Sequence, residues 1–499
     1  RPPRSTLFPY TTLFRSFSSQ SRLSFGLIME RDVAEPLYAK GKIYGADYYG
    51  GYLQINKLWR FSRIVVGDFR TRFGLGLVAN SSATFNSRLS LLRGKSFLSE
   101  GVRRKNSSSE ANYQRGIGAT YNIKQWSITA FYSARKIDAD TLSGCFPNII
   151  TTGYHRTETE ISHKRTVWQQ YFGGNITYNF KRGRVGITAT EMLLSDTLKP
   201  KLNYYNVNYF SGTRQAAIGV NTYYKFNRIE LFGEVATAQS HRWGFGGIGG
   251  MRFTPMSDIC LVVLGRYYSP YYDNLQAYAI GEDKRNNAES GVLIGASVDT
   301  EHQVKIRSFI DIFHFSQAKY GCKQPSEGVA ADIIVDYYAN NSLYMQGTFR
   351  AKYKYEKGLY SLRYRLDKSV GNLLFRTMIF GNICHFNKQT TYGAMLSQYV
   401  DYHIARVPIV LQLCFGAFYA PSYDNRFYYY ESDVLYNYSM PSLYGLGIRY
   451  AFNFRYTINK IFALYLKVSQ TIYNNEWTHS QQLKSPYKTE VHSVLRVTI

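Results

Sequence analysis

The sequence predicts an all-β protein, a large antiparallel transmembrane β-barrel of about 22 strands within a range of roughly 18 to 24. The first observation is composition: 46 tyrosines, 31 phenylalanines and 5 tryptophans bring aromatic residues to 16%, while charged residues reach only 19%. Average soluble domains carry about 25% charged residues. The second is period-two alternation of apolar and polar residues. The third is an alternation of short and long connections along the chain.

The first residues are not expected to belong to this fold. Thr6–Ser16 reads TLFPYTTLFRS, which looks like the translation of a common sequencing-adapter oligonucleotide. Residues 1–16 are therefore predicted to be an artefact, and residues 17–499 to form a single barrel domain. The natural N-terminus, with any signal peptide or preceding domain, is expected to lie upstream of this junction.

Long alternating segments predict the strands. Between Leu343 and Tyr355 one face carries Leu343, Phe349 and Tyr353, and the other carries polar and basic residues such as Arg350. Successive side chains of a strand point to opposite faces, so one face is apolar and the other is polar and faces water. Because a tilted strand needs about 9–11 residues to cross the hydrocarbon, such segments fit a barrel with lipid outside and water inside.

The predicted strands begin with 22–30, 47–57 and 59–72 and finish with 442–455, 461–472 and 491–499. Connections after even-numbered strands are short, as at 124–125 and 227–228, whereas most after odd-numbered strands are long, as at 80–114 and 136–169. This asymmetry is typical of outer-membrane barrels, whose long loops are extracellular, and the even count places both termini in the periplasm. Exceptions near 239–243 and 356–358 suggest one or two hairpins assigned out of register.

Composition excludes several other classes of protein. The aromatic content argues against disorder, and the sequence contains no window of about 18–20 apolar residues that would make a membrane-spanning helix. A soluble all-β repeat such as a propeller is the remaining alternative, but its strands are usually shorter. Five scattered cysteines without paired spacing predict neither a metal knuckle nor a disulfide framework.

The charge of +26 predicts anionic partners. Nucleic acid and the phosphates of a membrane surface, including lipopolysaccharide, both fit, and charge alone does not choose between them. The chain ends in a strand that carries Leu495, Val497 and Ile499 on one face, which resembles the C-terminal signal read by the outer-membrane assembly machinery, with Ile499 in place of the usual aromatic. Tyrosines at 267–272 and aromatic residues at 427–430 stand where strands meet loops, as in an interfacial girdle.

No constellation of residues predicts an enzyme or a cofactor. There is no nucleophile elbow and no HExxH, and Gly67, Gly74 and Gly76 are explained by bends and close packing rather than by a dinucleotide loop. One loop holds His155, Arg156, Glu158 and Glu160. Without a second cluster this group is a weak metal site, and we expect a loop ion-pair network that folds into the lumen.

A set of basic residues is predicted to line the lumen: Lys305, Arg307, Arg350, Lys352, Lys354, Arg363 and Arg365. On those stretches only Asp311 and Asp367 offset them. Two interpretations stay open. The residues form either a wall ladder paired with carboxylates elsewhere, or the lining of a channel for anions or polyanions.

Several ordered motifs resemble a large Bacteroidetes family of helix-hairpin-helix domain-containing proteins: residues 67–77, 110–116, 131–139 and 153–164, the last beginning Gly-Tyr-His-Arg-Thr-Glu-Thr-Glu-Ile. In that family a short periplasmic DNA-binding-type module precedes a large C-terminal barrel. The present sequence shows no helix-hairpin-helix segment, and the adapter junction suggests that it was cut off. The resemblance therefore implies the barrel portion, with nucleic acid as a partner through the missing module.

Together these observations predict a non-enzymatic outer-membrane channel or transport component, for anionic solutes or for DNA in concert with the periplasmic module. The alternative is a plugged barrel that acts as a surface receptor or adhesion protein through its long loops. The prediction names no metal, and it leaves the oligomeric state open.

Overall fold

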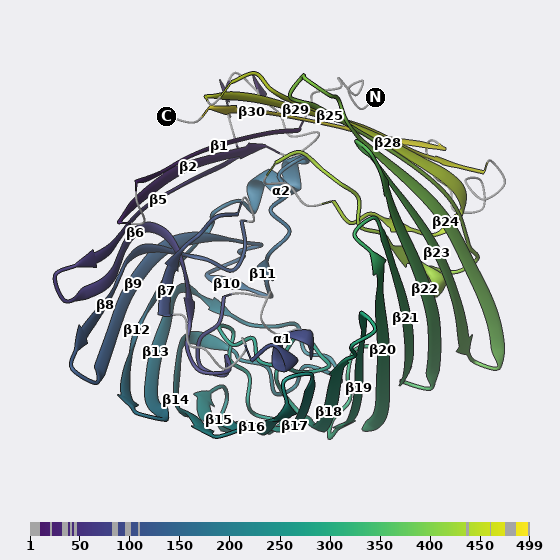
Figure 1. The fold of residues 1–499 in the computed structure, drawn as a ribbon. Helices are drawn as coiled ribbons and strands as arrows, with labels where there is room; N and C mark the ends of the chain where they lie inside the picture. The colour runs from purple at the N-terminus through teal and green to yellow at the C-terminus, as the bar shows by residue number, and fades with distance from the viewer. Residues whose placement is uncertain are drawn as a thin grey trace.

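The computed structural model describes residues 10–19, 22–31, 38–39, 42–43, 47–81, 88–94, 101–107, 110–435, 439–459, 461–474 and 486–497. Within these residues one sheet contains 26 strands, of which three are short pieces at its rim: β7 (Gly101–Arg104), β10 (Cys145–Phe146) and β11 (Ile149–Ile150). The others run in chain order around a ring (Figure 1). The expectation of an all-β antiparallel barrel is confirmed.

The wall strands of the first half of the ring are β1 (Tyr10–Ser19), β2 (Leu23–Arg31), β5 (Tyr48–Leu58), β6 (Phe61–Arg72), β8 (Gln114–Ile123), β9 (Trp126–Ala139), β12 (Val167–Phe180), β13 (Gly183–Leu198), β14 (Gly212–Phe226), β15 (Ile229–Gln239) and β16 (Trp243–Met256). Those of the second half are β17 (Ile259–Tyr268), β18 (Glu289–Asp299), β19 (Val304–Phe315), β20 (Ser326–Asn340), β21 (Leu343–Lys354), β22 (Lys357–Val370), β23 (Leu373–Phe386), β24 (Gln389–His403), β25 (Ile409–Ala420), β28 (Gly445–Thr457), β29 (Phe462–Tyr473) and β30 (Tyr487–Val497).

The remaining elements lie in the connections: the pair β3 (Tyr38–Ala39) and β4 (Lys42–Ile43), the pair β26 (Phe427–Tyr428) and β27 (Ser442–Leu443), helices α1 (Arg88–Leu92) and α2 (Glu158–Ser162), and one 3-10 turn (Tyr423–Asn425). Both α1 and α2 lie inside the ring in Figure 1. None of the helices in the described ranges has the length and apolar character needed to cross a membrane.

The ring meets itself at β1. This strand pairs antiparallel with β2 and parallel with β30, through Tyr10↔His492 and Thr11↔Ser493. It overlaps the adapter-like segment 1–16, of which residues 1–9 lie outside the described residues. The origin of that segment stays a prediction. Apart from β1 and the three short pieces, 22 of the 26 described strands remain, which is the predicted number.

The two ends of the barrel differ as predicted. One end carries tight turns such as 124–125, 181–182 and 227–228, and is called the short-turn end below. The opposite, long-loop end carries the connections at 73–113, 140–166, 199–211 and 269–288. Residues 240–242, 355–356 and 387–388 make tight turns at the long-loop end as well. The exceptions noted in the sequence are therefore real short hairpins and not register errors.

The outward face of the wall is apolar. On β19 the outward Ile310 and Ile312 are 51% and 60% exposed, whereas the inward Phe309, Asp311 and Phe313 are buried. At the short-turn end, aromatic side chains form an exposed band in which Trp126 packs on Tyr178 with ring centroids 4.8 Å apart. Apolar strand faces and an aromatic band are the features of a wall that meets lipid.

Not every aromatic cluster belongs to this band. Tyr268, Tyr272 and Tyr429 are almost fully buried, in cores that loops form against the inward face of the wall. The sequence-based assignment of the clusters at 267–272 and 427–430 to a girdle was therefore wrong for these residues. The C-terminal Ile499, named for the assembly signal, lies outside the described residues, and the side chains of Leu495 and Val497 are not described.

Candidate functional site

Part of the connection between β6 and β7 folds into the barrel. We call its described residues 73–81 and 88–94 the inner segment. Leu75, Leu77, Val78, Leu91 and Leu92 share one hydrophobic core with inward side chains of the wall. Because these apolar groups are buried against the wall rather than exposed at the rim, their burial holds the segment in the lumen.

A buried carboxylate fixes the turn of the inner segment. Glu234 on β15 accepts backbone N–H groups from Leu75 at 2.5 Å, Leu77 at 3.3 Å and Val78 at 3.4 Å. Gly74 and Gly76 have positive φ values of 56° and 97°, and a Cβ on Gly74 would lie 2.7 Å from the Glu234 carboxylate. The glycines thus serve a bend with close packing, as the sequence indicated.

Further side-chain hydrogen bonds hold the same segment. The Tyr272 hydroxyl donates to the carbonyl of Leu77 at 2.6 Å, and the Asn274 amide donates to the carbonyls of Leu77 and Val78. Arg252 donates to the carbonyl of Leu92 at 3.0 Å. Backbone groups that would be buried without partners are therefore satisfied by side chains of the wall and of the loop 269–288.

Helix α1 carries the inner segment into a network of charges on the wall. Arg88 lies 2.8 Å from Asp332 and 3.2 Å from Asp311. Asp311 is shared with Arg266, which is fully buried and also binds Glu289 at 2.7 Å. A buried arginine flanked by two carboxylates avoids an unpaired charge in the interior.

A second loop, 421–444, packs its described residues 421–435 and 439–444 against the wall near the point where the ring meets itself. Glu431, which is fully buried, lies 2.6 Å from the guanidinium of Arg449 on β28 and also contacts Lys467 on β29. Lys467 in turn lies 3.2 Å from Asp433 of the same loop. This loop therefore ties the last strands together from inside.

The predicted lumen residues lie on the inward faces of β19, β21 and β22, and most of them contact a carboxylate. The pairs are Lys305–Asp299 at 2.5 Å, Arg307–Asp336, Arg350–Asp332 at 3.1 Å, Lys352–Glu282, Lys354–Asp283 at 2.6 Å and Arg365–Asp367 at 2.5 Å. Arg363 lies over the ring of Phe380, 4.7 Å from its centroid. Of the two interpretations left open by the sequence, this geometry favours a ladder of ion pairs.

The loop motif separates into two groups. Arg156 binds Glu160 at 2.8 Å on exposed α2, where Thr157 and Glu160 form a capping box. Hydrogen bonds from Arg156 lower the pKa of Glu160 to about 2. His155 is buried and has different partners. Glu158 opens α2.

His155 belongs to a cluster that joins the loop around α2 to the start of β5 and the end of β9. Its Nδ1 lies 2.5 Å from Asp47 and its Nε2 lies 2.9 Å from Asp138, while Lys164 also contacts Asp47. Burial alone would lower the pKa of His155, but the hydrogen bonds to Asp138 and Asp47 outweigh it and raise that pKa to about 9. The imidazole is therefore expected to be charged at neutral pH, with both nitrogens donating.

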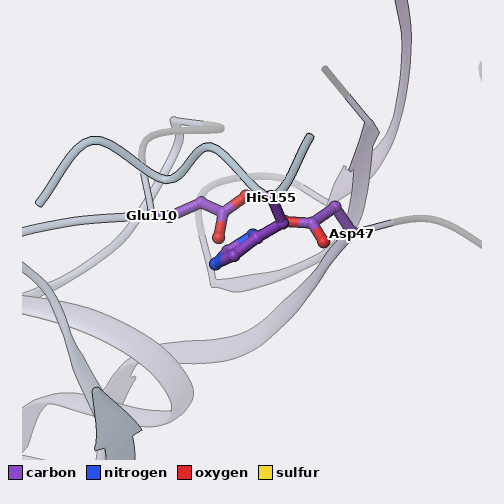
Figure 2. Close-up of side chains that lie close together, drawn as sticks. All are labelled: Asp47, Glu110 and His155. Atoms are coloured by element: carbon purple, nitrogen blue, oxygen red, sulfur yellow. The ribbon is translucent and has the colours of Figure 1, made fainter. Parts of the chain in front are cut away.

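One group of three side chains has the spacing of a metal site. Donor atoms of Asp47, Glu110 and His155 lie within 4.8 Å of one another (Figure 2). A metal ion would need the neutral imidazole, yet both ring nitrogens face carboxylates and Lys164 already neutralises Asp47. The donor set as arranged is an ion-pair cluster. Asp47 and Glu110 escaped sequence reasoning because they lie far from His155 in the chain.

A cavity of about 630 Å³ opens beside this cluster at the long-loop end, and we call it the rim cavity. It is bounded by the ends of β5 and β9, by Asn80 and Ser81 of the inner segment, and by the loops 199–211 and 269–288. A concave site of this size, lined by aromatic and polar groups, is typical of a small-molecule site. The loops that form it were predicted, but their meeting point was not.

Comparisons with known proteins give distant structural similarity. No family model and no curated protein matches the sequence. The chain is similar to the siderophore receptor PirA from Acinetobacter baumannii, with TM-score 0.46, 8% identity, and 96% of this chain and 79% of that chain covered. The FrpB iron transporter from Neisseria meningitidis is similar with TM-score 0.38 and 9% identity, and the match covers 72% of this chain and 66% of that chain. The chain therefore spans about two thirds of that protein.

A third similar structure is OccK5 (OpdH) from Pseudomonas aeruginosa, with TM-score 0.28, 10% identity, and 58% of this chain and 91% of that chain covered. At these scores the likeness carries no argument about ligands. The fold of this chain rests on its own strand pairing.

Proposed function

We propose that this chain is an outer-membrane transport or receptor barrel that receives small solutes at the rim cavity. The main observation behind this proposal is that Glu234 holds the inner segment in the lumen beside that cavity. The apolar outward face supports a lipid environment, and the one-sided long loops support an extracellular cavity with periplasmic termini. Lipid and lipopolysaccharide are then its surroundings, and no catalytic role is proposed.

Transport is the first form of this proposal. The inner segment narrows the lumen but need not block it permanently. Its polar contacts can open locally at a free-energy cost below that of global unfolding. Helix-hairpin-helix involvement and passage of DNA stay predictions from resemblance. The arginines and lysines of the wall are paired with carboxylates, so few uncompensated positive charges remain there to bind a polyanion such as DNA.

The receptor form is favoured by one specific observation. The second inward loop is tied to β28 and β29 through Glu431, Arg449 and Lys467, so two loops from different parts of the ring fold inward. A barrel narrowed in this way would bind solutes at its outer end and release them only after a conformational change.

Flux through reconstituted protein separates the two forms. The chain would be refolded into liposomes, and entry of glucose and of a large dextran followed by liposome swelling. We expect slow glucose entry and no dextran entry. Absence of any flux, with solute binding retained, would replace transport by the receptor form. A chain that fails to insert, or that passes dextran freely, would contradict the proposal as a whole.

A further inference from the structure

The charges of the rim cavity are arranged differently from those of the lumen wall. Six basic residues belong to its lining, and four of them come from four separate segments: Arg135 on β9, Arg165 after α2, Lys201 in the loop 199–211 and Lys284 in the loop 269–288. Within the described part of the chain, no carboxylate lies at ion-pair distance from any of these four, in contrast to Arg350 or Lys354 on the wall.

Arg135 is the most closely held of the four. Its guanidinium lies over the ring of Tyr113, 4.3 Å from the centroid, and one nitrogen donates to the carbonyl of Glu110 at 3.3 Å. Its Nε is buried with no hydrogen-bond partner among the described residues. A planar donor group fixed on an aromatic face, with donor capacity left over, is suited to a carboxylate or a phosphate.

The acidic residues of the cavity are already engaged. Asp138 accepts from His155 and from the backbone N–H of Arg165, and Asp273 binds Arg285 at 2.8 Å. Glu110 lies beside the charged His155. The cavity therefore carries an excess of positive charge, and its concave, partly desolvated wall concentrates the field of that charge on a bound solute.

The rest of the lining fits a hydroxylated solute. The rings of Tyr205 and Tyr209 belong to the lining, and several amides, among them Asn148 and Gln276, supply donors and acceptors. Aromatic faces with neighbouring amides suit a ring that bears hydroxyl groups, and the volume of about 630 Å³ accommodates one or two such rings.

We infer that the rim cavity binds small hydroxylated organic anions, that is, sugars carrying a carboxylate or a phosphate. This inference rests on the proposed function, because it names the class of solute that the barrel receives. The wall ladder identified from the sequence is then structural, and the anion selectivity of the protein lies at the cavity.

The test is equilibrium binding to the refolded full chain in detergent, with glucuronate, glucose 6-phosphate and neutral glucose as probes. We expect at least one of the two anions to bind about tenfold more tightly than glucose, and the preference to weaken with added salt because exposed charges are screened. The two anions separate a carboxylate-binding site from a phosphate-binding site.

Variants locate the binding. Arg135→Gln should weaken anion binding roughly tenfold, and Lys284→Gln, in an exposed loop, should weaken it roughly threefold. Each variant removes one donor cation from the cavity, so glucose binding should stay unchanged. Arg350→Gln removes the same charge from the paired wall and should leave anion binding unchanged. Heat-modifiable migration in gels reports that each variant is folded.

Equal binding of glucose and both anions would overturn the inference, and so would an effect of Arg350→Gln as large as that of Arg135→Gln. Either result, with flux or solute binding intact, leaves the proposed barrel function standing. A folded chain with neither flux nor binding of any probe would instead remove the proposed function itself.

Discussion

The imidazole of His155 donates from both ring nitrogens, to Asp47 and Asp138, and Lys164 contacts the same Asp47. These residues come from the start of β5, the end of β9 and the loop around α2. One side chain therefore fastens the loop 140–166 to two neighbouring parts of the rim. The adjacent pair Arg156–Glu160 is exposed and joins the residues before α2 to its first turn.

The His155 cluster predicts a pH dependence of loop protection. The raised pKa of His155 means that its stabilising effect is complete below the ordinary imidazole value of 6.5 and is lost as pH rises through about 9. Burial raises the pKa of Asp47, but its hydrogen bonds to His155 and Lys164 lower it below 3.8, so its contribution is lost only in stronger acid. Protection of residues 150–166 should be greatest between these limits.

Hydrogen exchange corrected for intrinsic rates measures this protection. His155→Gln should lower the free energy of local opening by about 3 kcal/mol at pH 6, since it removes the cation that binds Asp138 and one of the two cations that bind the buried Asp47. Arg156→Gln, the matched change at the exposed pair, should cost no more than about 0.5 kcal/mol. Equal protection of the unmodified chain at pH 6 and at pH 10 would contradict the assignment.

At the scale of elements, the inner segment and the loop 421–444 are held by different means. The inner segment is fixed where backbone N–H groups meet Glu234 and where leucines enter the wall core. The loop 421–444 is fixed by the fully buried charges of Glu431 and Lys467. The turn of the inner segment depends on one carboxylate on one strand, so a single substitution of Glu234 should loosen that segment.

Glu234→Ala should release the inner segment and raise ion conductance in planar bilayers. The change leaves three backbone donors without their acceptor, at a cost of roughly 3 kcal/mol or more. Glu234→Gln keeps one acceptor oxygen and should give an intermediate conductance. Glu327→Ala, an exposed position on β20, is the control and should behave as the unmodified chain does. Unchanged conductance in folded Glu234→Ala protein would show that the segment does not narrow the lumen.

At the scale of the whole molecule, the ring joins through β1. Without β1, the wall strands from β2 to β30 are even in number, and the first and last of them run antiparallel. With β1 included, the contact that joins the ring is the parallel pairing of β1 with β30. An even antiparallel set is the rule for bacterial single-chain barrels. The added strand lies largely in the segment whose sequence looks like a translated adapter.

Deleting residues 1–16 should therefore leave a barrel that still shows heat-modifiable migration, with β2 paired directly to β30. Deleting residues 1–31 removes β2 as well and leaves an odd number of wall strands, so it should lose that migration at a lower temperature. Loss of the folded form in the shorter deletion would show that β1 belongs to the barrel.

Much of the wall could be predicted from local pattern. On β21 the outward Phe349 and Tyr353 and the inward Arg350 and Lys352 follow directly from the pleat of a strand, which needs no knowledge of distant residues. Connection lengths likewise predicted which end carries the loops. The inward position of the basic residues was therefore predictable, but their partners were not, since Glu282 and Asp283 come from a loop.

By itself the sequence determined the barrel class, the strand order and the two unlike ends, because alternation and loop length are properties of short stretches of chain. Only the tertiary structure decided where the loops go. Leu75 and Glu234 are 159 residues apart, and nothing in either neighbourhood announces that a backbone turn meets a carboxylate there. Tyr272, which the sequence predicted to lie in the aromatic girdle, instead lies in the lumen and donates to the carbonyl of Leu77. Such contacts depend on loop closure across the ring, where burial and hydrogen bonding outweigh local preference.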